Sequence, residues 1–486
     1  METVDWFVIG FYLVIVMAIS FCQKNKMKTM RDYALGDQSF SAFSLFATMS
    51  TAVVGANTTL GLSAQSYAAG IIFLFTYFGC LVQQGLVTFA FATKLKKSFP
   101  QAMSVGDVMG SLYGKQGQII TGLFSLVFSI GIMSAQIAGM GYIFGFFLRI
   151  SYNLGCILGC AVVVLYASLG GIRGVINANI FQLVIVTISL SMIIAIGIQE
   201  AGGFMHAMQS IPKTHWELFR VMTPGTFMCI FCMRIFGTLL TPAYFQRILA
   251  AQSAKSYIIG NSFSIVFCMA IFALSCLAGL ISLSLYPNIH PSVAMLCLMN
   301  NIFPPVLIGF AVAGLLAVIM STTDAWLHSS SIALIHDVIL PFNVFKINPN
   351  QELKVAQATT LILGFLALGF CLSIPDIPSI VLYSFKFWAP TILVPLAFGI
   401  LGMTIGSRSF LLCLGIGLVT TLLWDGFCAK TTIAEGTLFG LAFHIIVFLV
   451  FYYYHKRKKE LLPSVPKQNL SSLYPVRSKT LDPIHN

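Results

Sequence analysis

Long apolar stretches alternate with short polar segments over almost the whole chain. Most stretches run for about twenty residues, the helix length that crosses the roughly 30 Å hydrocarbon core of a bilayer. The pattern therefore predicts an all-α polytopic membrane protein with about 13 transmembrane helices. Their expected bounds are residues 5–22, 42–64, 69–92, 118–147, 153–170, 175–199, 225–248, 257–285, 304–338, 355–375, 378–404, 409–427 and 434–454.

Two of these spans contain residues that break helices. The second carries GANTTLG (55–61), whose glycines, asparagine and threonines are poor helix formers. The seventh carries Pro242, which leaves carbonyls near Thr238 without a helical donor. Free carbonyls inside a bilayer are tolerated only where they line a cavity or hold a ligand. We therefore expect both spans to be broken; close helix packing through small residues is the alternative for the second.

Each broken span opens a set of five helices. Two odd-numbered sets run through the membrane in opposite directions, so the order predicts a ten-helix core of two inverted five-helix repeats, typical of a transporter with a mid-membrane site. The expected organisation is a leader helix and cytoplasmic loop (1–41), the first repeat (42–199), an extracellular loop (200–224), the second repeat (225–404), two trailing helices (405–455) and a basic, disordered cytoplasmic tail (456–486).

Composition agrees with a membrane protein. The 486 residues are 58% hydrophobic and 9% charged, with a mean hydropathy of +0.90, whereas soluble domains average roughly 25% charged residues. The first apolar run, Trp6 to Cys22, has an acidic rather than a basic start. It is therefore expected to remain as a span and not to be a cleaved signal peptide.

The net charge of +12 gathers on one side of the predicted membrane. Of the 27 Lys and Arg residues, 21 fall in the loops and tail on the side of the C-terminus. The positive-inside rule makes that side cytoplasmic, so we expect a multi-pass protein of the cytoplasmic (inner) membrane with its N-terminus outside and its C-terminus inside. The charge then requires no nucleic-acid partner, and the run HKRKKE after the last span is expected to contact the lipid bilayer.

Metal, cofactor and enzyme motifs are weak. Cys229 and Cys232 form a CxxC, and Cys156 and Cys160 lie one helical turn apart, but neither pair has the second pair or the histidines that a zinc site needs. We find no phosphate-binding glycine loop and no hydrolase motif. The sequence therefore predicts no enzyme, no organic cofactor and no metal other than Na⁺; a membrane-embedded enzyme would have to build on Asp324–His328.

Four stretches carry a resemblance to a known family. They are LGDQSF (35–40), YASLGGIRGVINANIFQ (166–182), YFQRILAAQSAKS (244–256) and AVIMSTTDAWLHSSSIALIHDV (317–338). In this order they resemble the sodium:solute symporter family over roughly residues 5–405, with the proline symporters of bacteria as the most similar members. The resemblance implies a leucine-transporter-like fold with a leading helix and trailing helices around the ten-helix core.

The resemblance also implies a sodium site between the first and eighth core helices. Its carbonyl ligands would be those of Thr51 and Val54 on the first, together with Val318 on the eighth, and its hydroxyls those of Ser321 and Thr322. Helix geometry agrees independently, because positions i, i+3 and i+4 share one face. Five neutral hard oxygens suit a monovalent cation. The alternative is that the two hydroxyls bond only to their own helix.

The chain departs from the family pattern at two positions. Ala178-Asn179 stands where the family has Thr-Asp, and Val53 stands where the proline symporters carry an aspartate. Asp324, one turn from Ser321 and from His328, is a candidate for a second cation or proton site together with Asn179. A static Asp324–His328 pair is the alternative, and proton coupling remains open.

The solute is expected between core helices 1, 2, 3, 6 and 10. Candidate contacts are Thr58, Gln83, Gln84, Gln136, Thr241, Arg234, Lys386 and Trp388. In the alternative interpretation, Gln83 and Gln84 form hydrogen bonds between helices. The charged ends of Arg234 and Lys386 then reach the outer surface instead of the cavity. If the Arg234 and Lys386 side chains both face the cavity, they favour an anionic or zwitterionic solute.

These observations favour a secondary active transporter. The expected activity is cation-coupled, most simply Na⁺-coupled, symport of a small organic solute such as an amino acid or carboxylate. A proton-coupled carrier and a membrane nutrient sensor built on a transporter fold are the alternatives. Nothing in the sequence indicates the oligomeric state.

Overall fold

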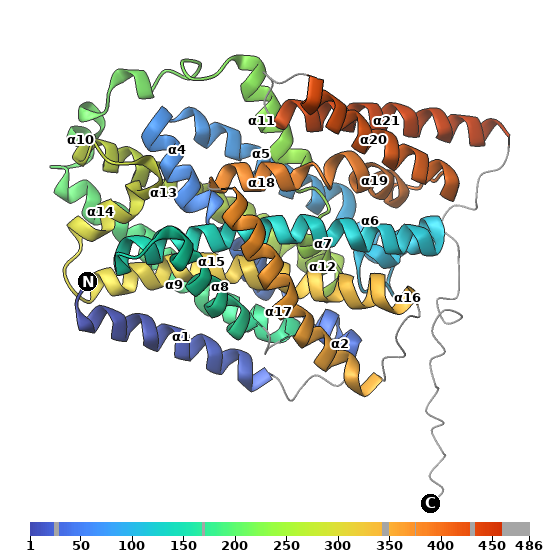
Figure 1. Cartoon of the computed structure of the whole chain (residues 1–486), viewed down its shortest axis with the longest axis horizontal. Helices are drawn as coiled ribbons and strands as arrows, with labels where there is room; N and C mark the ends of the chain where they lie inside the picture. Colours follow the sequence, from blue (N-terminus) through green and yellow to red (C-terminus); the bar gives the residue numbers. More distant parts are fainter. Residues whose placement is uncertain (24–28, 168–170, 343–348, 375, 428–432, 459–486) are drawn as a thin grey trace, which may run out of the picture.

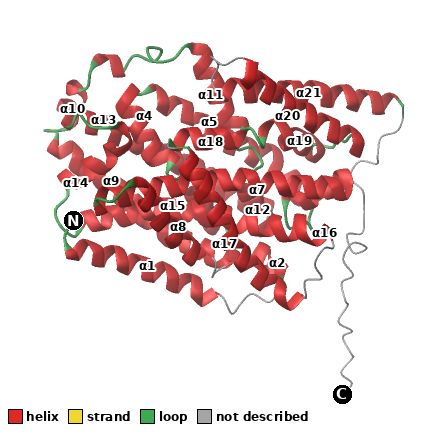
Figure 2. Cartoon of the chain, viewed as in Figure 1, coloured by secondary structure: helices red, strands yellow, loops and turns green. Residues whose placement is uncertain are grey.

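The computed structural model describes residues 1–23, 29–167, 171–342, 349–374, 376–427 and 433–458. Every regular element in these ranges is a helix, and the one β feature among them is an isolated bridge between Phe40 and Ala251 (Figure 2). The chain begins at one end of the helix bundle, here called the N-terminal face, and α21 ends at the opposite, C-terminal face (Figure 1).

A helix or a broken helix occupies each of the 13 predicted spans. Within the described ranges, nine helices are long and apolar enough to cross a membrane alone, and the bent pair α3/α4 makes a tenth; the rest include shorter apolar helices. The spans are α1 (Thr3–Gln23), α3, η3 and α4 (Ala42–Val53, Asn57–Gly61, Leu62–Ala69), α5, η4 and α6 (Ile72–Leu86, Val87–Phe91, Ala92–Ser98), α7 (Val105–Leu148), α8 (Tyr152–Ala167), α9 (Gly171–Glu200), α11 and α12 (Pro224–Phe236, Pro242–Ala250), α13 (Ala254–Leu285), α15, η7 and α16 (Leu307–Ile332, Ala333–Ile339, Leu340–Phe342), α17 (Pro349–Ser373), α18, η8 and α19 (Ile377–Phe385, Ala389–Leu393, Val394–Ile400), α20 (Ser407–Phe427) and α21 (Ile433–Arg457).

Both predicted breaks are confirmed. The axis bends by 59° between α3 and α4, over the GANTTLG stretch. In the second, α11 ends at Phe236 and α12 begins at Pro242, with Leu240 at a positive φ of 56° between them. The poor helix formers at 55–61 and the missing amide donor of Pro242 thus break the helices at the expected positions.

Several helices lie in segments predicted as loops. They are α2 (Met30–Leu35), α10 (Phe204–Ser210) and α14 (Ala294–Ile302). In addition, α7 begins at Val105 instead of at the expected residue 118, and bends at Gly114, whose φ is 76°. The early start has a local cause, because the Ser104 hydroxyl accepts the Asp107 amide at 3.0 Å and caps the helix.

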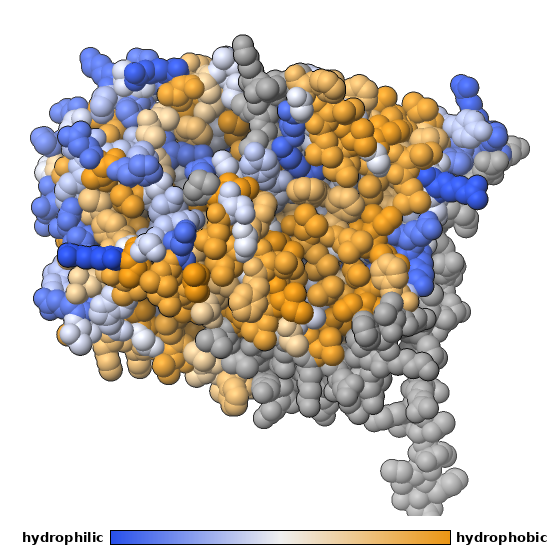
Figure 3. All heavy atoms as spheres, in the orientation of Figure 1, coloured by the Kyte–Doolittle hydropathy of each residue, from blue (hydrophilic) through white to orange (hydrophobic). Residues whose placement is uncertain are grey.

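An apolar belt surrounds the bundle between two hydrophilic ends. Figure 3 shows hydrophobic residues across the middle of the molecule and hydrophilic residues gathered towards the N-terminal and C-terminal faces. Large apolar side chains such as Phe7, Phe89 and Phe365 are exposed on the described part of the molecule. α15 and η7 form the most deeply buried span. The molecule therefore places its polar stretch at 321–331 in the centre of the bundle and its apolar surface outward.

Candidate functional site

The first broken helix meets α15 at a cluster of backbone and hydroxyl oxygens. The Thr322 hydroxyl lies 3.0 Å from the Thr51 carbonyl oxygen and 2.9 Å from that of Val54. The Ser321 hydroxyl lies 3.3 Å from the Thr51 oxygen and 3.0 Å from that of Val318. The structure thus brings together all five oxygens expected for the cation site; the cation itself stays a prediction.

Donors are scarce in this cluster. Thr322 carries one hydroxyl proton, yet its oxygen is within 3.2 Å of three carbonyls, those of Thr51, Val54 and Val318. The Gly55 amide, which a continuous helix would direct to Thr51, donates to the Thr58 hydroxyl at 2.8 Å instead. Two hydroxyl protons therefore serve more carbonyl lone pairs than they can satisfy, so the cluster could accept the cation that the sequence predicts.

Close approach at Gly55 keeps the cluster together. A Cβ there would lie 2.9 Å from both Thr322 Oγ1 and Gln136 Oε1. Gln136 in turn accepts the Ala56 amide at 2.8 Å and so caps the second half of the broken helix. Only a residue without a side chain allows α7 and α15 to meet the break at this distance.

A cavity lies beside this cluster, between the two breaks. It has a volume of about 60 Å³ and is lined by Ala52, Val53, Gly55, Asn57, Thr58, Cys80, Gln83, Ile132, Gln136, Arg234, Thr238, Tyr244, Thr322, Trp326, Val381 and Phe385. A volume of this size admits a few ordered waters. An organic solute therefore enters only when the side chains around the cavity move apart.

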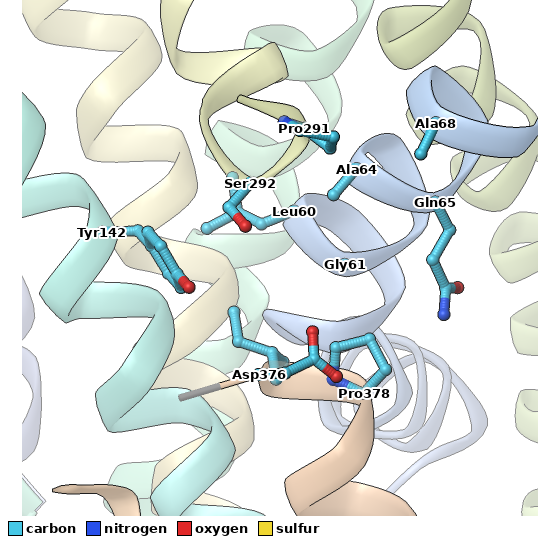
Figure 4. Close-up of a pocket in the computed structure, with 11 residues that line it drawn as sticks. Leu60, Gly61, Ala64, Gln65, Ala68, Tyr142, Pro291, Ser292, Asp376 and Pro378 are labelled. Carbon is cyan, nitrogen blue, oxygen red and sulfur yellow. The ribbon is translucent and has the colours of Figure 1, made fainter. Parts of the chain in front are cut away.

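A larger hollow of about 200 Å³, here called the vestibule, lies towards the N-terminal face. Residues of α4, α7, η6 (Pro291–Val293) and the start of α18 surround it, among them Tyr142, Ser292 and Asp376 (Figure 4). Leu60 and Gly61 line the vestibule, and Thr58, less than one helical turn before them, lines the cavity. The broken helix thus lines both spaces.

The C-terminal face is closed by the segment 29–41. His328 Nε2 lies 2.8 Å from the Tyr33 carbonyl, and Gln246 Nε2 donates to the Ala34 carbonyl at 2.7 Å. The Gln252 amide donates to the Phe40 carbonyl at 3.1 Å. The segment is therefore fastened to both α15 and α12, whereas the vestibule lies towards the opposite, N-terminal face.

The eight predicted solute contacts divide into two groups. Thr58, Gln83, Gln136 and Arg234 line the cavity. The others are engaged elsewhere: Gln84 accepts the Ser264 hydroxyl of α13 at 3.3 Å, Thr241 donates to the Thr238 carbonyl at 3.0 Å, the Trp388 indole donates to the Leu239 carbonyl at 2.9 Å, and Lys386 pairs with Asp425. All eight residues stay predictions as solute contacts.

The two basic side chains predicted to contact the solute, those of Lys386 and Arg234, point to different places. Lys386 Nζ lies 2.5 Å from Asp425 Oδ2 on α20, so it faces a trailing helix and not the cavity. Arg234, by contrast, is only 5% exposed and does not snorkel. Its guanidinium carbon lies 3.4 Å above the centre of the Tyr77 ring, a cation–π contact.

The interactions of Asp324, His328 and Asn179 gather around Arg247 and Thr48: Asn179 and Arg247 share the Thr48 hydroxyl, and Asp324 and His328 both interact electrostatically with Arg247. His328 turns its Nε2 atom to the Tyr33 carbonyl. Asn179 donates to the Thr48 hydroxyl at 2.9 Å. The static Asp324–His328 pair and the second cation or proton site both stay predictions.

Sequence reasoning missed Arg247. Arg247 is one of the 21 Lys and Arg residues that the sequence places on the cytoplasmic side, yet it is 1% exposed. Its guanidinium donates to the Ala243 carbonyl at 2.7 Å and to the Thr48 hydroxyl at 3.4 Å, and it interacts electrostatically with Asp324. Its place within YFQRILAAQSAKS was the signal that could have found it.

Known proteins are similar to this chain over most of its length. The sequence pattern of the sodium:solute symporter family matches residues 33–407. The sodium/pantothenate symporter of Escherichia coli (strain K12) is 24% identical over 379 residues, covering 74% of this chain and 77% of that protein. The sodium/proline symporter of Staphylococcus aureus is 22% identical over 381 residues, covering 75% and 74%.

Solved transporters share the fold. A Na⁺-coupled sialic acid symporter in its substrate-bound, outward-open state gives a TM-score of 0.80 at 15% identity, covering 93% of this chain and 98% of that one. Mhp1, a nucleobase-cation-symport-1 family transporter in a closed conformation with bromovinylhydantoin bound, gives 0.60 at 13% identity, covering 89% and 96%. These likenesses confirm the leucine-transporter-like fold of two inverted repeats.

Proposed function

Because this chain belongs to the sodium:solute symporter family, we propose that it carries a small organic solute across the cytoplasmic membrane together with Na⁺, by alternating access. In this proposal residues 42–199 and 225–404 act as the two inverted repeats. The N-terminal face is outside, because most of the Lys and Arg residues fall on the other side of the predicted membrane.

The convergence of five oxygens between the broken helix and α15 carries the proposal. Thr51 and Val54 belong to the helix that opens the first repeat, whereas Val318, Ser321 and Thr322 belong to the second. A cation held by both groups ties the two repeats together, and its release frees them to move relative to each other. Neutral carbonyl and hydroxyl oxygens suit Na⁺ better than a transition metal.

The vestibule on one side of the cavity and the segment 29–41 on the other support alternating access. A solute reaches the cavity from the vestibule on the outer side, past the broken helix. Release to the cytoplasm requires the segment 29–41 to detach from α12 and α15, which breaks the bonds from Gln246 to Ala34 and from His328 to Tyr33. In this proposal Na⁺ binds more tightly to the conformation in which these bonds are formed, and so it favours that conformation.

Uptake into proteoliposomes under imposed ion gradients tests the proposal. The purified full chain is reconstituted, and uptake of a labelled panel of amino acids, carboxylates and their amides is followed with an inward Na⁺ gradient, an inward H⁺ gradient or neither. We expect accumulation of at least one solute only with the Na⁺ gradient. Accumulation driven by H⁺ alone identifies a proton-coupled carrier, and binding without any uptake identifies a sensor; either result refutes the proposal.

A further inference from the structure

Three metal-ligating side chains meet inside the bundle, on the side of its C-terminal face. Asp107 belongs to the first turn of α7, whereas His336 and Asp337 belong to η7, the π-helical continuation of α15. The helix that follows η7, α16, lies towards that face (Figure 1). One ligand atom from each of the three side chains lies within 4.8 Å of the other two. Because 229 residues separate Asp107 from His336, no local motif in the sequence reveals this cluster.

The π-helical geometry of η7 brings two consecutive residues to one place. Neighbouring side chains of an α-helix point about 100° apart, yet both His336 and Asp337 reach the cluster. Turns of this kind are frequent at functional sites. Gly106 and Gly122 of α7 make room for Asp337, because a Cβ at Gly106 would overlap its carboxyl group and a Cβ at Gly122 would lie 2.8 Å from its Cβ. The cluster therefore depends on a close approach of α7 to η7.

Hydrogen bonds from the segment before α7 hold both carboxylates in place. The Met103 amide donates to Asp107 Oδ2 at 2.8 Å, and Asp107 Oδ1 lies 2.8 Å from His336 Nε2. The Ser104 hydroxyl donates to Asp337 Oδ1 at 2.6 Å. Outer partners that orient carboxylate and imidazole ligands in this way are typical of metal sites.

The charges of the cluster favour a bound cation. All three side chains are buried, since Asp107 is 8%, His336 2% and Asp337 1% exposed. Even with a protonated imidazole, two ionised carboxylates leave a net negative charge, which is costly to bury. A divalent ion held by two carboxylates and a neutral imidazole makes a neutral site. A proton on Asp337 is the competing way to neutralise the cluster.

We propose that Asp107, His336 and Asp337 bind a divalent transition-metal ion, with Zn²⁺ as its probe. One nitrogen and two carboxylate oxygens are ligands that Zn²⁺ takes at about 2.0–2.2 Å, and three protein ligands leave a position for water. Gln118 Nε2 lies 3.4 Å from Asp107 Oδ1. One turn further along α7, the buried Thr121 hydroxyl has no hydrogen-bond partner among the described residues and is available to such a water. Mg²⁺ and Ca²⁺ prefer more oxygen ligands than the cluster offers.

Metal titration of the purified full chain tests the site. The protein carries an affinity tag without histidines and is stripped of metal with a chelator. Binding of Zn²⁺ is followed by calorimetry and by the unfolding temperature, which rises when an ion binds the folded chain. We expect a single Zn²⁺ per chain to bind and stabilise the protein, and Mg²⁺ and Ca²⁺ to do so far more weakly. Substitution with Co²⁺ should give a spectrum of nitrogen and oxygen ligation without thiolate-to-cobalt charge transfer.

Variants that lack one ligand complete the test. Losing a partner that only orients a ligand costs a metal site about 10- to 100-fold in affinity. Asp337→Asn and His336→Gln remove ligands themselves, so each should weaken Zn²⁺ binding by about 100-fold or more. His206→Gln, which removes an exposed histidine of α10, is the matched control and should bind Zn²⁺ as the wild type does.

Three results would overturn the proposal. They are a wild type that does not bind Zn²⁺, an affinity that neither variant changes, and a thiolate band in the Co²⁺ spectrum, which would place the ion on cysteines. The first would leave a His336–Asp107 pair beside a protonated Asp337. The Co²⁺ spectrum of the wild type decides the matter even where a variant fails to fold. None of these measurements involves Na⁺ or a solute, so the proposed transport function is tested separately.

Discussion

Replacing Gly55 by alanine tests the geometry of the predicted cation site without removing any of its oxygens. The added Cβ would lie 2.9 Å from Thr322 Oγ1 and from Gln136 Oε1 and 3.1 Å from Gln136 Nε2. Both side chains are almost fully buried, so they can yield only by moving away from the break. Overpacking of this kind costs about 1–3 kcal/mol.

This displacement should weaken the binding of Na⁺. Moving the Thr322 hydroxyl by a few tenths of an ångström takes it off the Thr51 and Val54 carbonyls, and metal-site geometry tolerates little more than that. We expect the Na⁺ concentration for half-maximal uptake to rise roughly tenfold, equivalent to about 1.4 kcal/mol. The assay is the Na⁺ dependence of initial uptake, with Na⁺-dependent thermal unfolding of the purified protein as a solute-free measure.

Gly369→Ala on α17 is the matched control, because a Cβ there meets nothing within 4 Å. It should leave the Na⁺ dependence unchanged and stabilise the helix by up to about 1 kcal/mol. An unaltered Na⁺ dependence in Gly55→Ala, in protein that folds as well as the control, would refute the proposed geometry.

Three further predictions concern charges around the site. Lys386→Gln breaks the pair with Asp425 and should lower the unfolding temperature while the KM for the solute stays unchanged; a changed KM would place the lysine at the solute. Asp376→Asn keeps the cap on α18 but removes a negative charge from the vestibule, so the KM for an anionic solute should fall up to about threefold at low ionic strength and not at high. Asp324→Asn removes the carboxylate that interacts with the buried Arg247 guanidinium, and it should lower coupled uptake. Full activity with unchanged Na⁺ and pH dependence would show that the charge of Asp324 is dispensable.

The helix order and the two breaks could be predicted because their signals are local. Apolar runs of membrane length, a cluster of poor helix formers at 55–61 and Pro242 each act on the segment that contains them. The short helices α2 and α14 were missed, since a helix of six or nine residues at a membrane surface leaves no long apolar run. Likewise, the arm of α7 before Gly114 is too polar to read as part of a span.

The cation cluster could be predicted for its α15 half, because residues 318, 321 and 322 share a face of any helix. The orientation of single polar side chains could not. Gln83 and Gln84 are adjacent in sequence and point about 100° apart on a helix, so only one reaches the cavity. Lys386 is turned away by Asp425 on a different helix, and no local pattern reveals that partner.

The Na⁺ dependence of thermal stability in Thr322→Ala and Thr323→Ala tests the central claim most directly. Both variants remove one hydroxyl from the same helix, but the Thr323 hydroxyl bonds only the Ile319 carbonyl of its own helix, at 2.7 Å, among the described residues. Sodium titrations of the purified protein, at constant ionic strength maintained with choline, need no solute. We predict that Na⁺ stabilises the wild type and Thr323→Ala alike, and that Thr322→Ala needs about 10- to 100-fold more Na⁺ for the same shift. A wild type that does not respond to Na⁺, or equal responses in the two variants, would contradict the assignment.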